Sequence, residues 1–429
     1  MGSNKPINFL YHQKMNIISN IIEQHVEEAS FNWFLRDNAV TEPDYNLVDL
    51  AYLDDRIEAN IDGLRIAGEA GWDICLGAMD SGDPGEIFTA GVLAFESQIP
   101  KRMDSMLAAV EGNVESQRAL CSALGWINFR QVATSVNKIF EEDLAFLKCI
   151  GLSVYAIHRQ DIGASLETYI SHANHKVRSR ALKAAGELGR IDLLPKIRDR
   201  FSDKDEKCRF YAAWSAVLLG SNAGIDPLKR VLETQSVYEQ RACELAVRKM
   251  DNDEAVQWLN ELGRQSSTIR LAINGYGALG DPQAIPQLIE MMQAPELARA
   301  SGEAFSMITG VDITYLDLDA DAPEDFHAGP TEDPEDEDVD MDPDEDLPWP
   351  DPELISAWWH NNKQSFQSGR RYLAGNVISS ENCMHVLING FQRQRMAAAL
   401  ELALLHPGRP LFEVRAPGYR QQRLLAAGL

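Results

Sequence analysis

The sequence lacks the features that mark several large classes of protein. No apolar run approaches the roughly 20 residues needed to cross a bilayer, and the N-terminus shows no basic stretch followed by an apolar one. The six cysteines are scattered and form no Cys-x-x-Cys pair, which favours reduced, buried thiols over a disulfide framework. We therefore expect a cytoplasmic protein without membrane insertion.

Familiar catalytic motifs are missing as well. There is no Gly-x-Ser-x-Gly, no Walker A loop and no Gly-rich dinucleotide turn. His172 and His175 could both reach a metal, but two ligands in a predicted turn make a poor site. His25, beside Glu27 and Glu28 on a predicted helix, fits a capping or interface role better than catalysis. We expect no catalytic, cofactor-binding or metal-binding residues.

Basic residues are absent from one stretch, and this stretch sets the charge of the whole chain. Residues 317–346 hold 16 acidic side chains and no Lys or Arg, so the formal charge of −25 becomes −9 for the rest. A nucleic-acid binder needs a Lys/Arg surface, so we expect no nucleic-acid partner. The acidic stretch suits a protein partner with a basic surface.

The acidic stretch does not have the spacing of a calcium loop. Counted from Asp317, position six is Ala322 where glycine is required, and position twelve is Ala328 where a bidentate Glu is required. Few large apolar residues are present, and like charges extend a chain. We predict a disordered acidic insertion.

The region after the insertion has the opposite charge. From Lys363 onward there are nine Lys/Arg and three Asp/Glu. One hypothesis is that the acidic stretch pairs with this region, at Arg370 and Arg371. The alternative is a solvated insertion that touches nothing.

An internal repeat is the main signal that the sequence does contain. Segments such as "VRSRALKAAGELG" and "TIRLAINGYGALG" recur in five copies whose last residues fall at 189, 220, 250, 280 and 310. Apolar residues recur at helical spacing, small residues occupy the middle of each copy, and Gly or Asp-Pro marks the breaks. A period of about 30 with two helices per unit is typical of a solenoid. We predict an all-α, HEAT-like helical-repeat solenoid.

The solenoid divides the chain into four predicted segments. Residues 1–76 do not follow the period and form an N-terminal helical cap, and residues 77–316 form the repeats. Residues 317–352 form the acidic insertion, and residues 353–429 form a C-terminal helical, repeat-like module.

The candidate partner-binding residues come from three places. A basic residue recurs near one phase of the repeat, as either a ladder that grips a partner or a structural ladder between neighbouring units. The others lie in the acidic insertion and the segment after it. The full set is Arg178, Arg209, Arg241, Arg270, Arg299, Asp336, Asp338, Asp340, Asp342, Trp358, Trp359, Arg370 and Arg371.

Outside the repeats, several stretches carry a family resemblance. These are "EQHVEEASFNWFLRD", "DLAYLDDRIEANIDGLRIAGEAGW", "GRRYLAG" and "QRQRMAAALELALLHPGRPLFEVRAPGYRQ". Together they resemble a proteobacterial family of HEAT-repeat proteins whose genes accompany type VI secretion and effector loci. The resemblance implies a context without assigned catalytic residues.

The function that we predict is a non-enzymatic protein-binding scaffold. In the context of that resemblance it would be an immunity protein that binds and neutralises a secreted type VI effector toxin. One alternative is an adaptor or chaperone that escorts an effector for secretion. An alternative of another class is an enzyme, lyase-like, with its active site in the groove of the solenoid. Iron hydroxylases on this scaffold use His-Glu pairs, and the sequence contains no His-Glu dipeptide.

Overall fold

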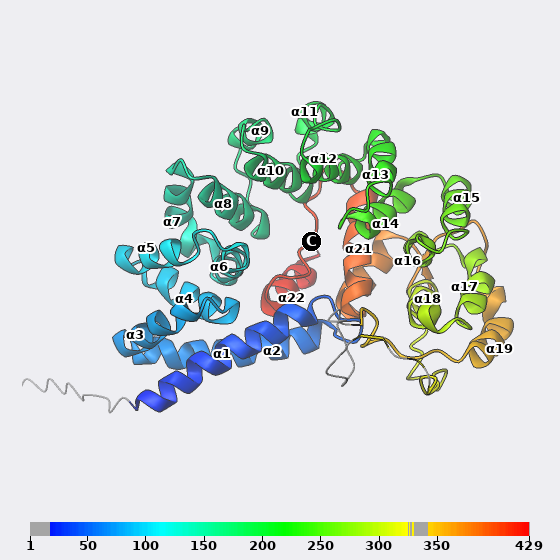
Figure 1. The fold of residues 1–429 in the computed structure, drawn as a ribbon, viewed down its shortest axis with the longest axis horizontal. Coiled ribbons are helices and arrows are strands. Elements are labelled where there is room, and N and C mark those ends of the chain that lie inside the picture. The colour runs from blue at the N-terminus through cyan, green and yellow to red at the C-terminus, as the bar shows by residue number, and fades with distance from the viewer. Residues whose placement is uncertain (1–17, 325, 327, 330–341, 429) are drawn as a thin grey trace, which may run out of the picture. The chain divides into compact units, whose positions relative to one another are not determined.

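The structure, a computed structural model, describes residues 18–324, 326, 328–329 and 342–428. These residues form 22 α-helices and a single two-stranded antiparallel pair, β1 (Tyr372–Leu373) and β2 (Asn376–Val377). The fold is therefore the all-α helical-repeat solenoid that the sequence predicts (Figure 1). Two compact units are present: residues up to 34 together with 55–123, and residues 35–54 together with those from 124 onward.

The first unit is built around Trp33. Its ring stacks on Phe88 with centroids 5.3 Å apart, and its Nε1 donates to Ser122 Oγ at 3.0 Å. Asp83 starts α4 by accepting from the N–H of Gly85, and Pro84 follows where no N–H partner is needed. The helices are α3 (Glu69–Ala78), η1 (Met79–Ser81), α4 (Pro84–Ser97), α5 (Pro100–Ala109) and α6 (Val114–Trp126), with parts of α1 (Ser19–Ala39) and α2 (Leu47–Ala67).

The second unit contains the repeats as a double layer of helices. The second helices of the repeats pack on one another in chain order, and the first helices pack against them on one side (Figure 1). We call these the inner and outer layers. The inner layer is α8 (Ala145–Ile157), α10 (His175–Glu187), α12 (Glu206–Leu218), α14 (Glu239–Lys249), α16 (Ile269–Leu279) and α18 (Pro295–Thr309). The outer layer is α7 (Phe129–Glu141), α9 (Ser165–Ile170), α11 (Leu194–Arg198), α13 (Ile225–Val231), α15 (Asn252–Leu262) and α17 (Ile285–Met291), with η2 (Ile191–Leu193), η3 (Asn222–Gly224) and η4 (Pro282–Ala284) between the layers' helices.

The period read from the sequence corresponds to the ends of the inner helices. Gly189, Gly220, Gly280 and Gly310 all follow an inner helix with φ between 70° and 90°. An L side chain rarely adopts this left-handed backbone, so glycine ends the helix at low cost. Met250, at the corresponding place after α14, continues with an extended backbone instead.

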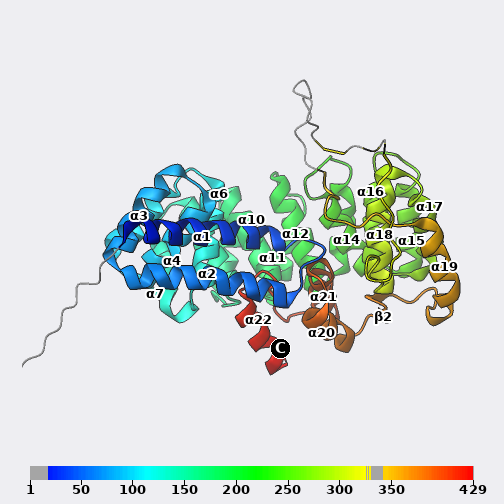
Figure 2. The ribbon, with the colours of Figure 1, turned by 90° about the horizontal axis from the view of Figure 1, so that it is seen from below.

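The chain then returns to the repeats through a C-terminal module, residues 363–428. It consists of η5 (Lys363–Ser365), the β1–β2 hairpin, α20 (Ser380–Asn389), α21 (Gln392–Leu405) and α22 (Gly418–Ala427), preceded by α19 (Pro352–Asn362), which packs on α17. Helix α21 packs on α12 and α14, on the side opposite the outer layer (Figures 1 and 2). The inner face of the repeats is therefore partly occupied by the chain itself.

The C-terminal module binds the carboxyl ends of the inner helices through backbone hydrogen bonds. The N–H of Ala374 donates to Met307 O at 2.8 Å, the N–H of Tyr372 to Gly280 O at 2.8 Å, and the N–H of Leu411 to Glu187 O at 2.9 Å. The last carbonyls of a helix have no partner within the helix. The module therefore satisfies acceptors that the repeats leave open.

Arginines of the module reinforce this contact. Arg371 donates to the carbonyls of Leu279 at 2.8 Å and Arg248 at 3.0 Å, and Arg420 donates to Gly125 O at 2.7 Å. Positive side chains are favourable at the negative end of the helix dipole. The basic balance of the module thus matches a row of helix C-termini.

Candidate functional site

The repeat arginines do not form a uniform ladder. Arg178 binds both oxygens of Asp203, at 2.7 and 2.8 Å, and also donates to His172 O. Arg209, one repeat later, donates to the carbonyls of Asp203 and Lys204. Both arginines clamp the turn that precedes their own helix, and Arg178 adds a bond to the next repeat. Arg178 therefore makes the contact between neighbouring units that the structural alternative describes, whereas the bonds of Arg209 stay within its own repeat.

Arg241 makes a different contact. Its guanidinium lies 5.4 Å from the ring centre of Phe210 and 5.8 Å from that of Tyr211, both in the preceding repeat. Cation–π contacts of this kind stabilise by about 0.5–1 kcal/mol at exposed sites. The side chain itself is exposed to solvent. Arg241 can therefore contact a partner while it stays stacked.

Arg270 and Arg299 bind the end of the acidic insertion. Arg299 pairs with Asp342 at 2.5 Å and donates to Asp344 O at 3.0 Å, and Arg270 pairs with the Asp344 carboxylate. Burial acts to raise the pKa of Asp342, but the N–H of Asp344 and the guanidinium of Arg299 lower it below its ordinary value. The Asp342 carboxylate is held ionised by the repeats.

Two aromatic side chains complete the contact. Arg299 lies 5.6 Å from the ring centre of Phe326 and 5.3 Å from that of Trp349, and these two rings meet edge to face. The N–H of Ala320 donates to Trp349 O at 2.9 Å, joining the two ends of the insertion. The described ends of the predicted disordered insertion thus have defined positions on the repeats. Asp336, Asp338 and Asp340 lie outside the described residues.

The hypothesis that Arg370 and Arg371 hold the insertion is wrong for its described carboxylates. Arg371 pairs with the buried Glu401 of α21, which also pairs with Arg248 at 3.1 Å. Arg270 and Arg299 take the role instead. The sequence could not separate these options, because a charge balance does not show which cations lie near which carboxylates.

The two tryptophans of α19 serve packing. Trp358 meets Phe305 edge to face at 5.5 Å, and Trp359 lies 5.4 Å from Phe366. Both are partly buried against the core of the last repeats. Their apolar surface is largely used inside the chain.

The histidines considered as ligands all have protein partners. His25 hydrogen-bonds Asn60 at 2.9 Å, His175 pairs with Asp205 at 2.9 Å, and His172 accepts from the N–H of Asn174. Among the described residues, no group of three or more His, Cys, Asp or Glu side chains could hold a metal.

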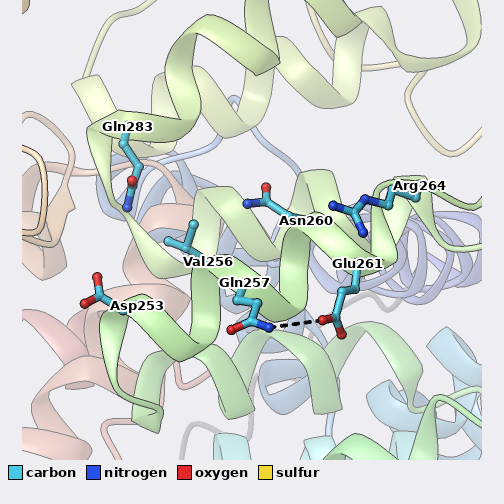
Figure 3. Close-up of a pocket in the computed structure, with 7 residues that line it drawn as sticks. All are labelled: Asp253, Val256, Gln257, Asn260, Glu261, Arg264 and Gln283. Atoms are coloured by element: carbon cyan, nitrogen blue, oxygen red, sulfur yellow. Dashed lines mark hydrogen bonds between the residues drawn. The ribbon is translucent and has the colours of Figure 1, made fainter.

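A hollow of about 310 Å³ lies along the outer helix α15 (Figure 3). Its side chains bond within the neighbouring elements: Gln257 donates to Glu261 at 3.4 Å, and Tyr276 donates to Asn260 at 2.8 Å. It is an open, polar surface feature, and it offers little to the alternative of an enzyme site. The lining residues are Asp253, Val256, Gln257, Asn260, Glu261, Arg264 and Gln283.

Comparison with known proteins agrees with this architecture. Residues 164–248, which cover α9 to α14, match the family model of HEAT repeats. HEAT repeats are typical of protein-interaction scaffolds, so the matched segment supports that class of function. No curated protein and no solved structure matches the chain significantly. No helix in the described part of the chain is long and apolar enough to span a membrane.

Proposed function

We propose that this chain is a non-enzymatic, cytoplasmic protein-binding scaffold. The observation that carries the proposal is the stacked HEAT-type array, which presents several parallel helices as one preformed surface. A preformed surface binds without the cost of ordering itself. The C-terminal module contacts the carboxyl-terminal ends of several inner helices, so the partner would use their amino-terminal ends and the outer layer.

Within this class, the partner that we propose is a secreted effector toxin with a basic surface, and the chain is its immunity protein. Two features support this. The sequence resemblance connects the chain to type VI effector loci, and residues 332–340 carry seven carboxylates directly before the anchored Asp342. Such a concentration of charge steers a basic partner and raises the association rate.

The test is co-expression with the toxins encoded beside the gene, measuring cell survival and co-purification. An immunity protein rescues growth and forms a stable complex with one toxin. If a complex forms and growth is not rescued, the alternative role of effector adaptor gains support. If no neighbouring toxin binds or is neutralised, the immunity role fails.

The acidic segment can be tested apart from its anchor. One variant replaces the seven acids of residues 332–340 by Asn or Gln and leaves Asp342 and Asp344 unchanged. We expect the association rate to fall about tenfold or more at low salt, with a weaker dependence on ionic strength. An unchanged rate and salt dependence would show that the segment does not steer the partner.

A further inference from the structure

A group of cations lies on the inner layer of the repeats. In α10, Lys176, Arg180 and Lys183 stand at positions i, i+4 and i+7, which share one helix face. Lys207 in α12 stands where Lys176 stands in α10, 13 residues before the glycine that follows the helix. Lys176 and Lys207 lie in the first turn of their helices, whereas Lys183 lies in the second half of α10.

Tyr211 is the centre of the group. Lys183 Nζ lies 5.7 Å from its ring centre, Arg241 lies 5.8 Å away, and Arg241 donates to the hydroxyl at 3.5 Å. Burial acts to raise the pKa of Tyr211, but the positive charges of Lys183, Arg241 and Lys207 lower it. Three repeats therefore concentrate positive potential around one aromatic ring.

Three carboxylates lie near the group: Glu187, Asp205, which pairs with His175, and Glu206, which precedes Lys207. Glu187 pairs with Arg180 at 2.9 Å and Lys183 at 3.5 Å, and is buried. Lys176 and Lys207 are exposed and form no ion pair with the described residues. In a chain of net charge −25, exposed lysines without an ion pair among the described residues are unexpected. Exposed like charges repel one another, so a bound anion would relieve the repulsion.

The neighbouring repeats already show how such cations are used. Arg270 and Arg299 of α16 and α18 hold Asp342 and Asp344 from the chain's own acidic insertion, with Trp349 stacked on Arg299. Arg241 lies in α14, the inner helix of the repeat before that of Arg270. Its guanidinium also stacks on aromatic rings. The cation group thus continues an interface in which the inner layer binds an acidic segment.

We propose that Lys176, Lys183, Lys207 and Arg241, arranged around Tyr211, form a docking surface for an acidic peptide segment of a partner protein. This surface is separate from the acidic segment that steers a basic partner, so the inference goes beyond the proposed function. Carboxylates of the peptide pair with the lysines and the guanidinium. The Tyr211 ring is only 6% exposed, so it contacts Lys183 and Arg241 from below and does not itself contact the peptide. Arg180 stays bound to Glu187 and Ser153 and positions the group.

A peptide fits this surface better than a nucleic acid does. Nucleic-acid binding depends on the summed attraction between many phosphates and a basic surface. The rest of this chain is acidic and repels a long polyanion. A short acidic segment needs only the local cations.

The test uses a fluorescent synthetic peptide with the sequence of residues 332–346 and the full-length protein. The variant K183E/K207E/R241E removes the central cations. The control K204E/R230E/R264E makes the same change in net charge at exposed side chains outside the group. We expect the dissociation constant to rise by about tenfold or more in the first variant and by less than about twofold in the control.

A second variant guards against a folding defect. K176Q/K207Q changes only the two exposed lysines, leaves the Lys183–Glu187 pair and the Arg241 stack intact, and should raise the dissociation constant of the peptide measurably with an unchanged melting temperature. A DNA oligonucleotide with eleven phosphates serves as the competing probe. Equal peptide binding by the first variant and its control would overturn the proposal. So would tighter binding of the oligonucleotide through the same cations.

Discussion

Glu401 lies between two arginines from distant parts of the chain. It is 1% exposed and pairs with Arg248 of α14 and Arg371 of the C-terminal module. The buried guanidinium of Arg248 and the partly exposed one of Arg371 share this carboxylate, and each also donates to helix carbonyls. A buried charge is tolerated only when it is paired and hydrogen-bonded. The position therefore joins the repeats to the module.

We predict that Glu401→Gln destabilises the second unit by about 3–5 kcal/mol, because the buried Arg248 and the partly exposed Arg371 lose their shared counter-charge. Urea unfolding followed by circular dichroism measures the change. Glu254→Gln, at an exposed position of α15, is the control and should change stability by less than about 0.5 kcal/mol. Equal midpoints for the two variants would contradict the prediction.

His158 is a second single residue that affects stability, in this case through its protonation state. Burial lowers its pKa to about 4, the positive charge of Arg420 adds to the effect, and its bond to Leu124 O, at 2.9 Å, opposes it. The neutral ring is therefore the native form. Below pH 6.5 the unfolded chain takes up the proton first, so stability is fully present above pH 6.5 and falls as the pH drops toward 4.

The variant His158→Gln keeps a donor for Leu124 O and does not titrate. Between pH 7 and pH 5 we expect wild type to lose roughly 2 kcal/mol more than the variant in free energy of unfolding. Urea titrations at several pH values measure the difference. Parallel pH profiles of the two proteins would exclude His158 as the cause.

At the scale of elements, the ends of the inner helices do two things. Their glycines stop the helix, and they let the C-terminal module approach the backbone. A Cβ on Gly280 would meet the carbonyl oxygen of Tyr372, and one on Gly310 would meet the backbone of Ala374. The repeat glycines are therefore also contact sites for β1 and the residues after it.

We predict that Gly280→Ala lowers the free energy of unfolding by more than the strain of a left-handed alanine backbone accounts for. Gly369→Ala is the matched control, because Gly369 has the same φ of 79° and open space around it. The control should lose about 1 kcal/mol, and Gly280→Ala clearly more, since β1 must move away. Thermal melts of both variants test this, and equal losses would mean that crowding contributes nothing.

The anchor of the acidic insertion is the second element with a specific expectation. Asp344 is buried and binds Arg270, whereas its neighbour Glu345 is exposed. We predict that Asp344→Ala releases this end of the insertion from the repeats and speeds cleavage between residues 342 and 351 by a nonspecific protease. Glu345→Ala is the control and should digest at the wild-type rate. A uniform rate among the three proteins would show that the ion pairs do not hold the segment.

At the scale of the whole molecule, thiol reactivity reports packing in both units. Burial raises the pKa of Cys75, Cys208 and Cys383 to about 12, and that of Cys243 also rises. All four are buried in the native structure. An increase of three pKa units leaves about a thousandfold less thiolate, the reactive form.

We predict that these four thiols do not react with a disulfide reagent at pH 8 within the time in which an exposed thiol is consumed. In guanidinium chloride all six cysteines should react at once. Mass spectrometry of the partly labelled native protein identifies the sites. Rapid labelling of Cys208 or Cys243 in the native state would mean that the repeats open far more readily than their packing implies.

The sequence by itself determined the repeats. Apolar residues at helical spacing force a helix to bury one face, and glycines and Asp-Pro steps mark its ends, so the period of about 30 predicted the inner helices. These signals are local, and a single repeat contains them all. The repeat pattern left the contacts of Arg178 and Arg209 open, and each binds the turn that precedes its own helix.

Only the tertiary structure decided where the C-terminal module and the ends of the insertion lie. Arg371 binds carbonyls 92 and 123 residues away, and Arg270 binds a carboxylate 74 residues away. The net charges of the acidic insertion and the basic C-terminal module indicate that ion pairs can form, but they do not identify which residues pair. The choice depends on how the stacked helices align their unpaired carbonyls and cations, and that alignment exists only after the chain has folded.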